Sequence, residues 1–132
     1  MKAVANPLNW SSTRPYSPAV IVGAWVYLSG HVPVDHEGRT CGSDVEGQAL
    51  QVLANIKRTL QSAGTSHRDV VATTVYLTDV NDMDSVDKVY RHFFDGPVLP
   101  SRTTVGIAAL GRPDFRVEIS AVAVTGASGT PL

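Results

Sequence analysis

Two side chains in the last third of the chain, Arg102 and Glu118, could act together on a small organic acid. The planar guanidinium of arginine binds a carboxylate through two parallel hydrogen bonds, and a glutamate can orient or activate a water molecule. Segments 100–107 and 115–124 are rich in Val, Ile, Thr and Phe, alternate with period two, and are separated by a turn rich in Gly, Pro and Asp. This pattern predicts a β-strand on each side of the turn.

The simplest connection between these strands is a hairpin centred on Leu110, which puts Arg102 directly opposite Glu118. Opposed Cβ atoms in antiparallel strands lie about 4.5–5.5 Å apart, so the pair would share a polar face with Thr104 and Ser120. One interpretation is an exposed cross-strand ion pair worth about 0–1 kcal/mol. The other is a site in which Arg102 binds a carboxylate and Glu118 orients or activates a water molecule. The second requires both side chains to converge on one cavity, and a one-residue bulge would break the pairing.

The size and charge of the chain limit its class. Its 132 residues predict a single domain over 1–132, with an irregular leader over 1–14 and a loose Gly/Ser-rich tail over 125–132. Eleven basic and 12 acidic residues give a net charge of −1 without a basic stripe, which argues against a nucleic-acid partner. An apolar run of the ~20 residues that a membrane helix needs does not occur, so we expect a protein without a membrane partner.

Cysteine and histidine usage excludes several kinds of site. Cys41 is the only cysteine, so the sequence contains neither a disulfide framework nor a CxxC motif, and a reducing cytoplasmic setting is the default. The four histidines lack the paired spacing of metal ligands, and we therefore expect no metal.

The remaining elements must position Arg102 and Glu118. Segments 19–22 and 25–29 flank Gly23 as a hairpin, and a capping box at Ser43 and Glu46 begins an amphipathic helix that ends at Gly64. A strand over 70–78 and a second helix, from Asn81 or Asp82 to Asp95, follow. The predicted order is β-β-α-β-α-β-β, an α+β fold with both helices on one face of the sheet.

The strand at 70–78 has apolar residues on both of its faces. Alternation puts Val70, Ala72 and Tyr76 on the face opposite Val71 and Val75. Because two helices cover only one face of the sheet, we expect the other face to be buried in a homo-oligomer with ligand sites at its seams.

Two segments near the N-terminus could contribute to a ligand site. Pro15 and Pro18 stiffen the chain around Tyr16, which would present this ring in a defined direction, although a structural tyrosine explains the pattern equally well. The Ser29-Gly30 pair ends the first predicted hairpin, where a glycine permits a close approach of the backbone to a ligand.

These motifs together resemble the RidA family, also called YjgF/YER057c/UK114, whose members are small trimeric proteins of chorismate-mutase-like fold. The resemblance covers nearly the whole chain, from Pro15 to Val124. The matching pieces, in chain order, are Pro15-Tyr16-Ser17, Ser29-Gly30, the Gln48 to Asn55 helix, Ala63-Gly64, the Asp79 region, Phe93-Phe94, Pro100-Ser101-Arg102 and Val117-Glu118-Ile119.

The resemblance implies hydrolytic deamination of reactive enamines and imines such as 2-aminoacrylate, without a metal or an organic cofactor. By this analogy Arg102 holds the substrate carboxylate and Glu118 positions the attacking water. Ser29, Gly30 and Tyr16 would line the pocket, with Tyr16 reaching the ligand across a subunit interface of a homotrimer.

Four residues depart from the pattern of deaminating relatives. Asp87 stands where many have Asn, His31 where Gln is usual, Thr104 where Cys is common, and Arg14 where Gly is frequent. A carboxylate at position 87 that lined the pocket would repel an anionic substrate unless Arg14 or a protonated group neutralised it. Alternatively, Asp87 only caps or solvates the second helix.

Two other functions fit these residues. One is a dedicated catabolic deaminase of the 2-aminomuconate or 3-aminoacrylate type, in which an added arginine at the mouth suits a second substrate carboxylate. The other is a non-catalytic regulatory protein that binds a small carboxylate, which would need Arg102 but not Glu118.

Overall fold

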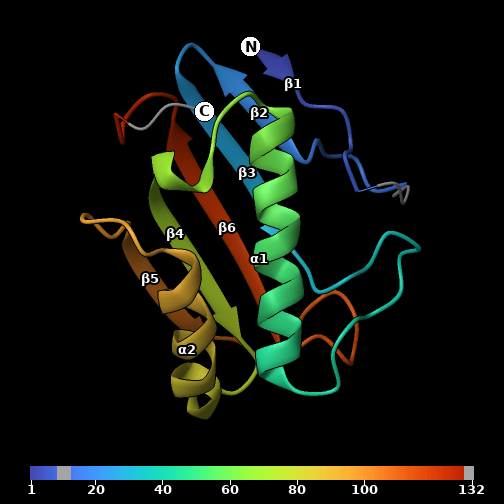
Figure 1. The fold of residues 1–132 in the computed structure, drawn as a ribbon. Coiled ribbons are helices and arrows are strands. Elements are labelled where there is room, and N and C mark those ends of the chain that lie inside the picture. The colour runs from blue at the N-terminus through green and yellow to red at the C-terminus, as the bar shows by residue number, and fades with distance from the viewer. Residues whose placement is uncertain (9–12, 130–132) are drawn as a thin grey trace.

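A computed structural model describes residues 1–8 and 13–129. The elements in chain order are β1 (Lys2–Ala3), β2 (Ala19–Val22), β3 (Trp25–His31), α1 (Val45–Ser62), the 3-10 helix η1 (His67–Asp69), β4 (Val70–Leu77), the 3-10 helix η2 (Val80–Asp82), α2 (Met83–Phe93), β5 (Ser101–Gly106) and β6 (Val117–Val124). The α+β class and the order β-β-α-β-α-β-β are confirmed, with β1 as an addition (Figure 1).

The strands of the described residues form one six-stranded sheet in the order β1-β2-β3-β6-β4-β5. The predicted hairpin between the last two strands is therefore wrong. Strand β4 lies between them, antiparallel to β6 and parallel to β5. Arg102 is paired with Thr73 and Glu118 with Tyr76, so Arg102 and Glu118 are not cross-strand neighbours. The 11-residue helix α2 connects β4 to β5, and such a crossover is what a parallel pair requires.

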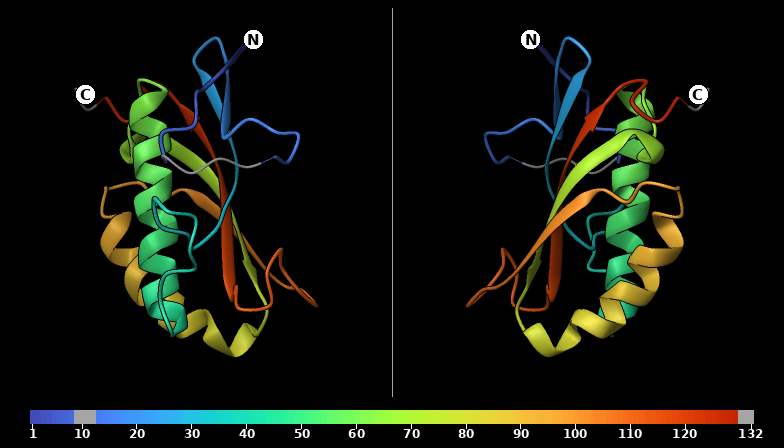
Figure 2. Two further views of the ribbon diagram at one scale, coloured as in Figure 1. Left: turned by 90° about the vertical axis from the view of Figure 1, so that its right-hand side faces the viewer. Right: turned by 90° about the vertical axis from the view of Figure 1, so that its left-hand side faces the viewer.

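Both helices cover the same face of the sheet, as predicted (Figure 2). The buried core lies between them and alternate residues of the strands, and its largest fully buried members include Leu53, Ile56, Leu60, Leu77 and Ile119. The opposite face, called the outer face below, exposes Val22, Trp25 and Tyr27 by 47%, 47% and 48%. Both faces of the sheet therefore carry apolar side chains, and the largest exposed ones lie on β2 and β3.

A register shift in β4 changes one assignment of faces. Val70 is paired with Ala123 and Ala72 with Val122, so a bulge at Val71 interrupts the alternation. Val70 consequently lies on the core side and is 6% exposed, whereas the sequence predicted it on the same face as Ala72.

The described parts of the leader and of the tail both make contacts with the sheet and its connections. In the leader, Lys2–Ala3 pairs with β2, and Val4 is buried. In the tail, the backbone N–H groups of Gly126 and Ser128 donate to the Asp69 carboxylate over 3.1 and 2.9 Å. The tail is therefore anchored as far as Ser128.

The sequence predicted the positions of both helices correctly but not the roles of the residues that begin them. The N-cap of α1 is Asp44 rather than Ser43, and its carboxylate accepts from the Gly47 N–H over 2.8 Å. Helix α2 begins after Asp82, whose carboxylate pairs with Arg116 instead of capping the helix. In the part of the chain that the structure describes, neither helix is long and apolar enough to cross a membrane.

Candidate active site

Glu118 opens onto a cavity of about 470 Å³ on the outer side of the sheet. This volume lies within the usual range for small-molecule sites. The cavity is lined by Arg14, Tyr16, Ser29, Gly30, Val32, Val34, Gly111, Arg112, Phe115 and Glu118. The structure therefore brings together four of the predicted site residues, namely Glu118, Tyr16, Ser29 and Gly30.

A bulge in β3 determines how Gly30 meets Glu118. Leu28 is paired with Ala121 and His31 with Ile119, so β3 has one residue more than β6 between these two pairs. A Cβ atom on Gly30 would lie 2.3 Å from Glu118 Oε2, closer than atoms can approach. The absence of a side chain at position 30 is what makes room for the Glu118 carboxyl group.

The environment of Glu118 favours its protonated form. Burial raises the pKa of the Glu118 carboxyl above the ordinary range of glutamate, because a charged carboxylate is poorly solvated there. Among the described residues, the ion pairs do not include Glu118. A half-buried carboxyl with a raised pKa, facing a cavity, has the properties of a general acid–base group.

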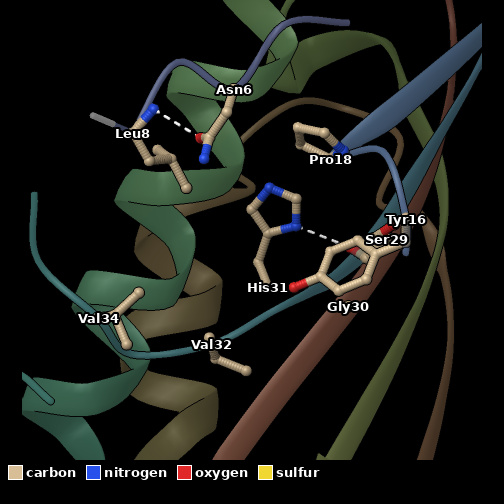
Figure 3. A pocket seen from close by; sticks show the side chains of 9 residues that line it. All are labelled: Asn6, Leu8, Tyr16, Pro18, Ser29, Gly30, His31, Val32 and Val34. Carbon is tan, nitrogen blue, oxygen red and sulfur yellow. Dashed lines mark hydrogen bonds between the residues drawn. The ribbon is translucent and has the colours of Figure 1, made fainter. Parts of the chain in front are cut away.

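A second cavity of about 130 Å³ shares Tyr16, Ser29 and Gly30 with the first and extends to His31 (Figure 3). His31 is buried, donates from Nδ1 to the Ser29 carbonyl over 2.7 Å, and lies with Nε2 2.8 Å from Thr59 Oγ1. Burial lowers the pKa of His31 despite the Ser29 carbonyl, so the ring is neutral and connects β3 to α1. The Ser29 hydroxyl donates to the Ser17 carbonyl over 2.6 Å and thereby ties β3 to the segment that carries Tyr16.

Arg102 lies on the other side of the sheet, with the helices. Arg102 Nη1 is 2.7 Å from Asp87 Oδ1, and the guanidinium carbon is 4.8 Å from the centroid of the Tyr90 ring. Both partners belong to α2, and Thr104 shares the helix-facing side of β5 with Arg102. Asp87 Oδ1 is buried without an aligned hydrogen bond, so the contact is a charge pair.

The predicted convergence of Arg102 and Glu118 does not occur within one chain. Their backbones are two strands apart, about 10 Å at the usual strand spacing, and their side chains leave opposite faces of the sheet. The physical reason is the insertion of β4 between β5 and β6. Arg102, Asp87 and Thr104 form one group, and Glu118, Tyr16, Ser29 and Gly30 form another.

Two further residues can be placed. Tyr16 lines the cavity of its own chain, and its contact with a ligand across a subunit interface stays a prediction. Asp87 is paired with Arg102, while Arg14 lies at the Glu118 cavity. From the sequence, Trp10 is expected to cover part of the body, and this residue lies outside the described ones.

Sequence reasoning missed one charged residue of the Glu118 cavity, Arg112. This residue sits in the Gly/Pro/Asp-rich turn before β6, which was interpreted only as a hairpin turn. Its position next to Pro113, five residues before the start of the strand that carries Glu118, was the available signal. In the described residues, groups of three or more His, Cys, Asp or Glu side chains that could hold a metal ion are not found.

The chain is similar in sequence to several known proteins. Residues 8–125 match the family model described as Endoribonuclease L-PSP. A mouse protein named 2-iminobutanoate/2-iminopropanoate deaminase is 42% identical over 113 residues, covering 85% of this chain and 82% of that protein. A Salmonella typhimurium protein of the same name is 36% identical over 125 residues, covering 93% and 97%.

Solved structures agree with the sequence matches. E. coli TdcF with bound serine superposes with a TM-score of 0.87 at 35% identity, covering 94% of this chain and 98% of that one. A Yersinia pestis structure described as a conserved Rid family protein of unknown function gives a TM-score of 0.88 at 33% identity, covering 94% and 98%.

Proposed function

Because the chain belongs to the RidA (YjgF/YER057c/UK114) family, we propose that it hydrolyses 2-imine and 2-enamine carboxylates to 2-keto acids and ammonia. The observation that carries the proposal is the Glu118 carboxyl, with its raised pKa, facing a cavity beside Ser29 and Gly30. Two relatives that are 36% and 42% identical are named for this reaction.

The reaction needs one carboxyl group that can both accept and return a proton. Water attacks the imine carbon, a C–O bond forms, and Glu118 accepts the proton that the water releases. Glu118 then returns this proton to the nitrogen. The C–N bond breaks with its electron pair leaving on ammonia, and Glu118 accepts the hydroxyl proton as the carbonyl forms. Such general acid–base catalysis contributes typically ~10²–10⁴-fold to the rate.

The substrate carboxylate requires a cation, and Arg102 is our candidate. A small acid cannot touch Arg102 and Glu118 of the same chain, because the sheet separates them. Arg102 lies on β5, which is an edge strand and is open to a neighbouring molecule. We therefore assign each complete site to two copies, one supplying Arg102 with Thr104 and Asp87, and the other supplying Glu118 with Tyr16, Ser29 and Gly30.

The assembly that we propose is the homotrimer implied by the family resemblance, with its sites at the interfaces. The exposed Trp25 and Tyr27 rings, stacked with centroids 6.2 Å apart, support burial of the outer face by other copies. A cytoplasmic location suits a chain whose one cysteine, Cys41, is a free thiol.

The direct test measures ammonia release from imines that an amino-acid oxidase generates in situ. We expect turnover of 2-iminopropanoate and 2-iminobutanoate. Arg102→Ala should raise KM and lower kcat/KM strongly, and Glu118→Ala should mainly lower kcat. Unchanged turnover in both variants would contradict the proposed mechanism.

Mixed assemblies test the division of the site between copies. Arg102→Ala and Glu118→Ala chains are each expected to be inactive alone. When they are unfolded together and reassembled, roughly one site in four should combine an intact Arg102 with an intact Glu118 and recover activity. A site contained in one chain would give no recovery, and the mixture of separately folded variants is the control.

A further inference from the structure

Tyr90 and Thr73 carry hydroxyl groups that the proposed chemistry leaves unused. Both residues are buried, and their hydroxyl oxygens share a hydrogen bond of 2.8 Å. Burial raises the pKa of the Tyr90 phenol above the ordinary range of tyrosine, so the phenol stays protonated at neutral pH. The hydrogen bond connects α2, which carries Tyr90, to β4, which carries Thr73. It therefore fixes where the Tyr90 ring lies over the sheet.

Both residues are neighbours of Arg102. Thr73 is paired with Arg102 where β4 and β5 run side by side. The Arg102 guanidinium lies over the Tyr90 ring, with its central carbon 4.8 Å from the ring centroid. The three residues thus form a closed circuit, in which strand pairing joins Arg102 to Thr73, a hydrogen bond joins Thr73 to Tyr90, and a cation–π contact joins Tyr90 back to Arg102. The direction of the long Arg102 side chain is consequently set relative to its own strand.

The ring and the carboxylate that contact Arg102 have different effects on it. Asp87 precedes Tyr90 by three residues on α2, so both side chains lie on the same side of the helix. Asp87 Oδ1 attracts one nitrogen of the guanidinium over 2.7 Å, whereas the Tyr90 ring supports its carbon centre. The ring packs in turn against Phe94, with centroids 4.7 Å apart. Since an arginine binds a carboxylate through N–H groups in the plane of its fork, a ring that holds the guanidinium affects this binding directly.

We propose that Tyr90, held by Thr73, is a positioning residue that directs the Arg102 guanidinium toward the substrate carboxylate. This inference rests on the proposed function, in which Arg102 of one copy must reach the Glu118 cavity of another. A flexible side chain loses conformational entropy when a ligand holds it in one geometry. A guanidinium that is already held over a fixed ring loses less. Tyr90 and Thr73 thereby strengthen carboxylate binding through Arg102.

The test compares calorimetric binding of 2-oxobutanoate with that of its neutral amide, and the ratio of the two affinities is called the anion preference. Tyr90→Leu should reduce the anion preference by about fivefold, as the loss of a partly buried cation–π contact predicts. Tyr90→Phe keeps the ring and should retain most of the preference, and Thr73→Val should cause a smaller loss than Tyr90→Leu. Phe93→Leu, a change of a ring on the same helix that packs on His67 and Phe94, is the matched control and should leave the preference unchanged.

The kinetic constants should change in the same pattern. Tyr90→Leu should raise KM for 2-iminobutanoate by about fivefold and leave kcat within about twofold, because Glu118 and its cavity are untouched. Equal losses in kcat in Tyr90→Leu and in the Phe93→Leu control would indicate a general structural effect and would overturn the positioning role.

Coupling to Arg102 is the sharpest measurement. In an Arg102→Ala background the guanidinium is absent, so Tyr90→Leu should not reduce the anion preference further. A further loss in the double variant would show that Tyr90 acts through another group and would overturn the inference. If Tyr90→Leu does not fold, as judged by circular dichroism, Tyr90→Phe combined with Thr73→Val replaces it in the cycle and should reduce the preference by about twofold or more.

The outcomes separate this inference from the proposed function. An anion preference that Arg102→Ala reduces and Tyr90→Leu leaves unchanged overturns the positioning role, while turnover of 2-iminobutanoate leaves the deaminase intact. If 2-iminobutanoate is not turned over, the deaminase fails, and the binding cycle with the two oxo compounds still decides the role of Tyr90. An anion preference that Arg102→Ala leaves unchanged overturns both the inference and the assignment of Arg102 to the substrate carboxylate.

Discussion

At the scale of residues, the proposed chemistry depends on one carboxyl group and on the space that a glycine leaves for it. The Glu118 carboxyl occupies the space that a side chain at position 30 would fill, next to the bulge in β3. Burial raises its pKa, and the cavity gives it access to a ligand.

The pH dependence of catalysis should report the raised pKa of Glu118. The group must be ionised to accept a proton from water, so kcat/KM should fall as the pH decreases through a value above the ordinary glutamate pKa of about 4.3. Glu118→Gln should lower kcat by ~10²–10⁴-fold and remove this acid limb. The exposed Glu46→Gln change on α1 is the control and should leave the profile intact. If kcat/KM of Glu118→Gln still falls at low pH in the same way, another group is responsible for the titration.

Gly30→Ala should damage activity more than stability. The added methyl group would displace the Glu118 carboxyl, since its Cβ would be 2.3 Å from Oε2, and the backbone at Gly30 is not in a left-handed conformation. We expect a loss of kcat of at least tenfold, measured by ammonia release, with a small shift in the melting temperature. Gly96→Ala, where the nearest atom is 3.9 Å away, is the matched control. Equal activity of the two variants would contradict the role of this close approach.

Asp87→Asn should make Arg102 a better partner for a carboxylate. Asp87 neutralises this guanidinium in the structure, and the amide would keep the shape while removing the charge. A pair of this exposure is worth up to ~1 kcal/mol, so we expect KM for 2-iminobutanoate to fall by about fivefold with little change in kcat. A raised KM would instead show that the carboxylate is needed to hold Arg102 in position.

At the scale of elements, the position of β4 decides which residues can meet. Strand β4 separates β5 from β6. As a result, the Arg102 side chain lies toward α2, and Glu118 lies on the outer face. The crossover through α2 is the cause, because it returns the chain parallel to β4 at the edge of the sheet. The proposed two-copy site would bring these two groups of residues together.

Asp69 fastens the end of β6 to the start of β4, and its replacement should destabilise the fold. The buried carboxylate accepts from the N–H groups of Gly126 and Ser128 and from Thr65 Oγ1. Asp69→Ala should lower the free energy of unfolding by about 2–3 kcal/mol in urea denaturation, because charged hydrogen bonds are lost. The exposed Asp84→Ala change is the control.

The same contact should contribute to the acid sensitivity of the fold. Burial alone would raise the pKa of Asp69, but the hydrogen bonds from Ser128, Gly126 and Thr65 outweigh it, and the pKa is lowered. The stabilisation is therefore complete above the unfolded pKa of about 3.9 and is lost as the pH falls through the lower folded value. An acid-unfolding midpoint that Asp69→Ala leaves unchanged would contradict this contribution.

At the scale of the whole molecule, one face of the sheet is covered by helices and the other is open to a partner. Val22, Trp25 and Tyr27 are about half exposed on this outer face, and the Glu118 cavity lies on the same side. Assembly would bury these side chains and complete the proposed site in one step.

Light scattering should give three times the mass of one chain, which is 14.0 kDa. Tyr27→Glu should weaken the assembly by placing a charge on the apolar face and should lower activity in parallel. Leu50→Glu is the matched control, since Leu50 is 59% exposed on α1, on the helix side. A chain that stays monomeric and active would exclude a site shared between copies.

Much of the fold was predictable because its signals are local. Alternation identified the strands and the faces within β5 and β6, and helical periodicity located α1 and α2 to within a few residues. The bulges in β3 and β4 were not predictable, because each depends on how a neighbouring strand is paired. For the same reason, Val70 was assigned to the wrong face.

The sequence by itself determined that Arg102 and Glu118 lie on strands, which residues share their faces, and which family the chain resembles. Only the tertiary structure decided that these faces are opposite and that Arg14 and Arg112 lie beside Glu118. The physical reason is that side-chain alternation defines each strand relative to itself, whereas the order of strands in a sheet depends on contacts between segments far apart in the chain.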